Sequence, residues 1–165
     1  MSMSKPFPRA GFRRRLGSYI YDFLMAVAVY MLAGFIVSVP YLYLFDQGII
    51  DSQGYAHAID LLNSHWFYVT LNEAWKLFWV GFFFVYFWAK AGQTIGMRAW
   101  RLLVQHQDGS PINKATGCKR LLFTLLGLGN FWVLFDRKNK LSLQDRMTDT
   151  EVVVLSVEAN RAAMG

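Results

Sequence analysis

Long apolar runs separated by short polar segments set the elements that this chain predicts. The first run, Phe23 to Phe45, has 23 residues without a charge, and as a helix it would be about 35 Å long. The hydrocarbon core of a bilayer is about 30 Å thick. We therefore expect a first transmembrane helix over about 16–45, with Pro40 near its far end. The run is longer than the apolar region of a signal peptide, so we interpret it as a retained anchor.

Two further apolar runs follow. A second transmembrane helix is expected over about 66–89, where tryptophans suit the two membrane interfaces. The third run, 121–135, is short for a full span, and glycine and asparagine weaken its middle as a helix. It is basic on both sides, which favours a re-entrant or interfacial segment over a plain third span. Both alternatives remain open from the sequence.

Two segments have the pattern of strands. The stretch from Met97 alternates apolar and polar residues and then reaches the turn signal Asp108-Gly109, and residues 150–157 are rich in β-branched side chains. We expect β-rich parts over about 92–112 and 148–157 that form a small sheet. The sheet should pack on the helices, because two or three strands alone are marginally stable. Residues 158–165 are expected to be a loose tail.

These elements predict the fold class. We expect an α-helical integral membrane protein with one domain over residues 1–165. It has two transmembrane helices, a third short apolar helix that is a span or a re-entrant or interfacial segment, and a small cytoplasmic β-hairpin or sheet.

Composition supports a membrane protein. Hydrophobic residues make up 55% of the chain and charged residues only 17%, whereas soluble domains are about 25% charged. The net charge of +6 raises the question of nucleic acid. The basic residues do not share one helical face and no nucleic-acid motif interleaves them, so we expect no nucleic-acid binding.

The distribution of charge predicts the orientation. The connection between the first two spans, 46–65, contains aspartates but no lysine or arginine. The N-terminal tail and the 90–120 loop are basic, so the positive-inside rule places both in the cytoplasm. We expect a multi-pass protein of the cell inner membrane with a cytoplasmic N-terminus. The basic residues behind this prediction are Lys5, Arg9, Arg13, Arg14, Arg15, Lys90, Arg98, Arg101, Lys114, Lys119 and Arg120.

Motifs for metal or enzyme chemistry are absent from the sequence. Cys118 is the only cysteine, and the three histidines are far apart, so we predict no metal site and no cofactor. No nucleophile and base pattern and no phosphate loop occurs. We therefore predict no catalytic residues and expect that the protein is not an enzyme.

Asp22 is the first candidate for a functional residue. It lies seven residues after Arg15, which is about two helical turns, so the two side chains share nearly one helix face. Ionised carboxylates near hydrocarbon are costly, so Asp22 should be paired, face a wet cavity or take up a proton. A structural role, in which it holds a neighbouring helix, is the alternative.

Other charged residues further along the chain are also candidates for functional residues. Glu73 and Lys76 are three residues apart and can pair on one face at the mouth of the second helix. Asp145 follows the third apolar run, where a role as a turn or cap residue is the alternative. The secondary candidates are Glu73, Lys76, Arg14 and Arg146.

Three segments in order resemble the RDD family of bacterial membrane proteins, which is named for one arginine and two aspartates. By position, these residues fall on Arg15, Asp22 and Asp145. The chain has Gln144 where the family often has histidine, and Met97 where lysine is common. The resembling segments are AGFRRRLGSYIYD (Ala10–Asp22), GQTIGMRAWRLLVQHQDGS (Gly92–Ser110) and LSLQDRMTDTEVVV (Leu141–Val154).

The resemblance implies transport of an unidentified ligand, with ion–proton exchange suggested for some members. In that hypothesis Asp22 binds the ion or titrates, and Arg15 tunes the pKa of Asp22. Asp145 reaches the same cytoplasmic mouth and binds or releases the ion. Because so few spans cannot enclose a pathway, the lipid-embedded chain needs a homo-oligomer or a partner membrane protein. The alternative is an accessory, scaffold or regulatory subunit, in which the three charges form a structural latch between the first helix and the sheet.

Overall fold

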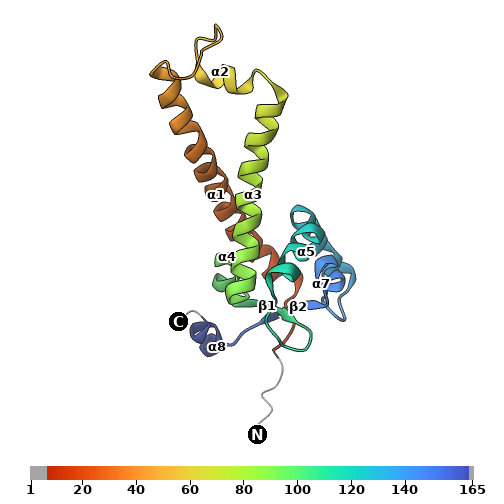
Figure 1. Ribbon diagram of the computed structural model, residues 1–165. Helices are drawn as coiled ribbons and strands as arrows, with labels where there is room; N and C mark the ends of the chain where they lie inside the picture. Colours follow the sequence, from red (N-terminus) through yellow and green to blue (C-terminus); the bar gives the residue numbers. More distant parts are fainter. Residues whose placement is uncertain (1–6, 164–165) are drawn as a thin grey trace. The chain divides into compact units, whose positions relative to one another are not determined.

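The computed structural model describes residues 7–163, with side chains other than those of 125 and 126 (Figure 1). Lys5, counted in the basic N-terminal tail, lies outside these residues. The chain divides into two compact units. The first comprises residues up to Met25 together with Phe83 onwards, and the second is Ala26–Phe82. The boundary between them falls within the two long helices.

Helix α1, Phe12–Asp46, contains the first predicted span and includes Pro40. Among the described residues it is the one helix long and apolar enough by itself to cross a membrane. Its large apolar side chains, such as Phe23 and Ile36, are mostly exposed. An exposed apolar helix of this length is suited to lipid rather than to a soluble core.

Helix α3, Trp66–Ala91, coincides with the second predicted span. It has the length of a span but does not reach the mean hydropathy of one. The charges of Glu73 and Lys76, and the tryptophan and tyrosine rings, lower that mean. The helix stops at Gly92, whose φ of 65° is a left-handed conformation that glycine adopts easily. Between α1 and α3 lies the short helix α2, Ala58–Asn63.

The sheet of the first unit has two antiparallel strands. Strand β1, Leu102–His106, pairs with β2, Thr150–Val154, in the register Leu102 to Val154. The predicted sheet is confirmed, but it is not a hairpin, because the turn at Asp108-Gly109 leads away into α5. Leu102 and Val104 face the core, as the alternation predicts.

The strand prediction began too early. Residues from Ile95 to Ala99 form a short helix, α4, and β1 starts only at Leu102. The hydroxyl of Thr94 caps α4 by accepting a hydrogen bond from the Met97 N–H. Side-chain caps of this kind stabilise a helix start that strand propensity does not reveal.

The third apolar run is not a straight helix. It comprises the end of α5, Lys114–Thr124, the 3-10 helix η1, Leu125–Phe131, and α6, Trp132–Phe135. The two helical parts are bent by 82°, as in a broken span or a re-entrant loop. Counted as one span, the pair would be a second candidate crossing.

The C-terminal part is more ordered than the sequence suggests. Helix α7, Leu143–Met147, precedes β2, and α8, Val157–Ala162, follows it. The prediction of a loose tail from residue 158 was wrong for the described part, because Asn160 is buried and donates a hydrogen bond to the Arg98 carbonyl. The apolar core of this unit comprises Ala10, Trp88, Met97, Leu102, Val104, Ile112 and Val152.

Candidate functional site

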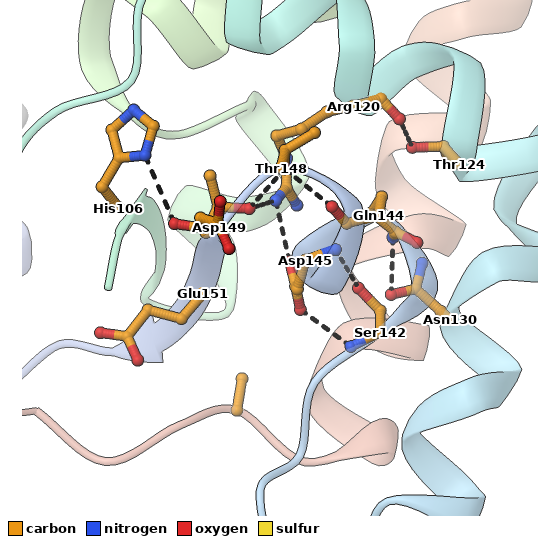
Figure 2. A network of polar contacts seen from close by, with 12 residues as sticks. His106, Arg120, Thr124, Asn130, Ser142, Gln144, Asp145, Thr148, Asp149 and Glu151 are labelled. Carbon is orange, nitrogen blue, oxygen red and sulfur yellow. Dashed lines mark hydrogen bonds and ion pairs between the residues drawn. The ribbon is translucent and has the colours of Figure 1, made fainter. Parts of the chain in front are cut away.

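Asp145 lies at the start of helix α7, in a capping box. The Ser142 hydroxyl accepts from the Asp145 N–H at 3.3 Å, and the Asp145 carboxylate accepts from the Ser142 N–H at 3.0 Å (Figure 2). This reciprocal pair satisfies two backbone donors at a helix start. The carboxylate is therefore fixed by its own segment before any other element contacts it.

Two arginines from distant helices converge on this carboxylate. Arg15 of α1 lies 2.8 Å from Asp145 Oδ2, and Arg120 of α5 lies 2.8 Å from Asp145 Oδ1. Arg120 also donates to the Thr150 hydroxyl of β2. All three charged side chains are almost completely buried. Asp145 thus joins α1, α5 and α7, and Arg120 connects this cluster to β2.

The electrostatics of Asp145 follow from this geometry. Burial by itself would raise the pKa of the Asp145 carboxyl, because a low dielectric disfavours the charged form. The guanidinium groups of Arg15 and Arg120, with the hydrogen bonds from Ser142, outweigh burial and hold the pKa of Asp145 below its ordinary value. Asp145 is therefore an ionised, structurally committed group.

Amide side chains extend the cluster. Asn130 Oδ1 accepts from Gln144 Nε2 at 3.0 Å (Figure 2). It also accepts from Arg15 Nη1 at 3.4 Å. Gln144 Nε2 also lies 3.4 Å from the Tyr19 hydroxyl. Gln144 thus lies inside the network and acts as a hydrogen-bond bridge.

Asp22 is held in a different way. Its carboxylate accepts from the Thr94 hydroxyl at 2.6 Å, from the Gly96 N–H at 2.8 Å and from the Ser18 hydroxyl at 3.2 Å. All three donors are neutral, and the structure gives Asp22 no ion pair among the described residues. The side chain is 3% exposed, so a buried carboxylate sits without a cationic partner.

Arg15 does not pair with Asp22. Arg15 is committed to Asp145 and to the carbonyls of Ala10 and Lys140. Helical spacing places Arg15 and Asp22 on nearly one face, but a guanidinium on a long side chain reaches the better acceptor set. The predicted residues therefore form two neighbouring groups, one around Asp145 and one around Asp22.

A small cavity connects the two groups. Its volume is about 30 Å³, and both Asp22 and the two buried arginines line it. A few buried ionisable side chains in a largely apolar cavity are a recurring feature of functional sites. The lining residues are Arg15, Ser18, Tyr19, Asp22, Phe84, Trp88, Met97, Leu102, Arg120, Asn130 and Val152.

The family assignment rests on the stretch that contains both groups. The profile of the RDD family matches residues 9–149. The chain belongs to the RDD family. No curated protein and no solved structure matches the chain. Membership in this family of membrane proteins agrees with the long apolar α1 and places the chain with the membrane.

The secondary candidates of this RDD protein lie apart from the two groups. In the second unit, Glu73 pairs with Lys76 on α3 and accepts from the Tyr30 hydroxyl of α1. In the first unit, Arg14 lies 3.5 Å from the Trp100 carbonyl. Arg146 pairs with Asp136 at 2.7 Å and is half exposed. No metal ligand group of three His, Cys, Asp or Glu occurs in the described part of the chain.

Sequence reasoning missed Arg120, Ser18 and Thr94. Ser18 had a signal, because it lies one helical turn before Asp22 on the same face. Thr94 had a weaker one, as a capping residue inside a family segment. Arg120 had none, since it is one of two adjacent basic residues before an apolar run, and only the packing of α5 on α7 distinguishes it from Lys119.

Proposed function

We propose that this RDD protein is a multi-pass protein of the cell inner membrane that takes part in transport of an ion or small ligand, as an oligomer. Asp22 is the residue that binds the ion or exchanges the proton. Asp145 does not have this role, because its carboxylate is already paired with two buried arginines.

The neutral character of the groups that hold Asp22 carries this proposal, since among the described residues no cationic side chain pairs with its carboxylate. A carboxylate held by two hydroxyls and one backbone N–H can gain or lose a proton, or exchange a cation, without breaking an ion pair. The hydroxyls of Ser18 and Thr94 can rotate to follow such a change. Buried carboxylates in membrane helices are, by default, candidates for ion or proton pathways.

The distribution of charge along the chain supports an inner-membrane protein with a cytoplasmic N-terminus. The basic N-terminal tail and the 90–120 loop favour one side, and the acidic 46–65 connection favours the other. In this arrangement α1 and α3 both cross. The Asp22 group then lies near the cytoplasmic end of α1, within reach of water.

An oligomer is part of the proposal because two crossing helices do not enclose a pathway. The native mass of the complex, extracted together with its lipids, tests this part. A mass equal to several copies of the 19.0 kDa chain supports a shared pathway. A monomer contradicts it.

Flux through liposomes containing the purified protein tests the role of Asp22. Internal pH is followed with a pH-sensitive dye after a sodium or potassium gradient is imposed. Asp22→Asn is nearly isosteric and should abolish proton-coupled flux while the protein still inserts. Asp46→Asn, at the exposed end of the same helix, is the matched control and should keep wild-type flux. Equal flux in wild type and Asp22→Asn contradicts the proposal.

A second function, that of an accessory subunit of another membrane complex, is favoured by the Asp145 group. Its two arginine ion pairs join elements far apart in the chain and leave the carboxylate no exposed surface. A purely structural latch needs nothing more. Recovery of one stoichiometric partner in mild detergent, with no flux by the purified chain, supports this function. Repeated recovery of this chain alone contradicts it.

A further inference from the structure

The cavity between the Asp22 and Asp145 groups contains hydrogen-bonding capacity that the surrounding protein atoms do not use. Arg120 Nε–H and Asn130 Nδ2–H are buried and have no hydrogen-bond partner among the described residues. Both side chains line the cavity. A buried donor without a partner is costly, so native proteins usually satisfy such groups with protein or ordered water.

The side chains of Arg120 and Asn130 cannot rotate to bring these two donors to other protein partners. Arg120 Nη1 is committed to Asp145 and to Thr150. Asn130 Oδ1 accepts from Arg15 and Gln144, which fixes the amide so that Nδ2 is its free end. These contacts hold both side chains, and with them the two donors, in place.

Acceptors line the same cavity. Asp22 Oδ1 accepts only from the Gly96 N–H, whereas Oδ2 already accepts from two hydroxyls. A carboxylate oxygen has room for about two donors, so Oδ1 has capacity left. The Tyr19 hydroxyl is a further polar group on the cavity wall.

Charge and size select the ligand. When all four groups are ionised, Arg15 and Arg120 balance Asp22 and Asp145, so a ligand that stays in the cavity while Asp22 exchanges neither proton nor cation should be neutral, because an added charge would be uncompensated. A neutral ligand with both donors and acceptors keeps the balance. A volume of about 30 Å³ is enough for one or two water molecules, each of which needs at least ~10–15 Å³ measured in this way.

We propose that this cavity is a water-binding site that links the Asp22 carboxylate to Arg120 and Asn130. The water accepts from Arg120 Nε–H or Asn130 Nδ2–H and donates to Asp22 Oδ1 or the Tyr19 hydroxyl. The site does not depend on a transport function. If Asp22 exchanges a proton, this water is the hydrogen-bond partner of its carboxylate inside the protein.

Hydroxyl-radical footprinting of the full-length protein in lipid tests the site. Radiolysis of bound water oxidises adjacent side chains even when they are buried, and Met97 and Trp88 line this cavity. Both should be oxidised in the wild type. Val152→Ile, which adds a methyl group to the cavity wall, should lower Met97 oxidation several-fold, and Val152→Ala should raise it.

The matched control is Val154→Ile. Val154 lies on the same strand face as Val152 and packs on the same core, but it does not line the cavity. It should leave Met97 oxidation unchanged. The proposal is overturned if Met97 is not oxidised in the wild type, or if neither Val152 variant differs from Val154→Ile.

A bound anion is the competing outcome, and thermal unfolding distinguishes it. The unfolding temperature is compared in chloride and in gluconate at equal ionic strength. Water predicts equal temperatures in both salts. A rise in chloride that Val152→Ile removes, and that Val154→Ile keeps, shows a halide in the cavity and overturns the assignment to water.

Discussion

Two buried aspartates in one small region are satisfied by different chemistry. Asp145 accepts from two guanidinium groups and one backbone N–H, whereas Asp22 accepts from two hydroxyls and one backbone N–H. The first arrangement fixes the ionised form. The second leaves the carboxylate able to change state, because neutral donors on rotatable hydroxyls adapt to either form. The same residue type therefore has two roles at the residue scale.

Asp145→Asn should destabilise the protein by about 3–5 kcal/mol, because removing one member of a buried ion cluster leaves Arg15 and Arg120 uncompensated. Asp149→Asn is the matched control. Asp149 is exposed and has a left-handed φ of 50°, which asparagine tolerates. It should change stability by less than about 0.5 kcal/mol. Thermal unfolding in detergent measures both, and similar losses in the two variants would refute the latch.

The pH dependence of stability should also report Asp145. Its pKa is lowered on folding, so its contribution is present above its ordinary pKa of about 3.9 and is lost as pH falls through the lower folded value. The stability difference between wild type and Asp145→Asn should therefore shrink below about pH 4, by up to about 1.4 kcal/mol per pH unit. Unfolding at pH 7, 5, 4 and 3 measures this difference. A constant difference down to pH 3 would contradict it.

At the element scale, the docking of α4 on α1 depends on close approach. An ideal Cβ on Gly96 would collide with the Ser18 carbonyl oxygen and lie 2.7 Å from the Asp22 carboxyl carbon. Trp100 packs equally closely on Gly17. Glycine at these positions allows the α4 backbone to donate directly to Asp22. The Asp22 group therefore depends on Gly17 and Gly96 as well as on its polar residues.

Gly96→Ala should push α4 away from α1 and break the hydrogen bond from residue 96 to Asp22. Overpacking against backbone usually costs about 1–3 kcal/mol. Gly11→Ala is the control, since a Cβ there meets nothing within 4 Å. Thermal unfolding and the flux assay should both show a loss for Gly96→Ala and none for Gly11→Ala. Wild-type behaviour of Gly96→Ala would mean that the close approach is not required.

At the scale of the whole molecule, the number of segments that cross the bilayer decides how the chain is oriented. α1 has the length and hydropathy of a span, and the 82° bend in the third run is compatible with a broken span or a re-entrant loop. The single cysteine makes the question accessible. Cys118 is exposed and lies just before the bent run, so thiol labelling from either side of the membrane reports its location.

A membrane-impermeant thiol reagent should label Cys118 only from the cytoplasmic side. On a Cys118→Ser background, Ser52→Cys should be labelled only from outside, because it lies in the acidic connection. Lys138→Cys decides the third run, since a re-entrant segment puts it on the side of Cys118 and a full span puts it opposite. Labelling of Cys118 from outside would reverse the proposed orientation.

The sequence by itself determined the two long apolar helices, the approximate places of the two strands, the family and the residues Arg15, Asp22 and Asp145. These follow from local patterns, because apolar length, β-branched content and motif spacing are properties of neighbours along the chain. The partners were decided by the tertiary structure. Arg15 pairs with Asp145 across most of the chain, and β1 pairs with β2 rather than forming a hairpin, because long-range contacts depend on how elements pack. Arg120 belongs to the site only because α5 packs on α7, so no local pattern could have identified it.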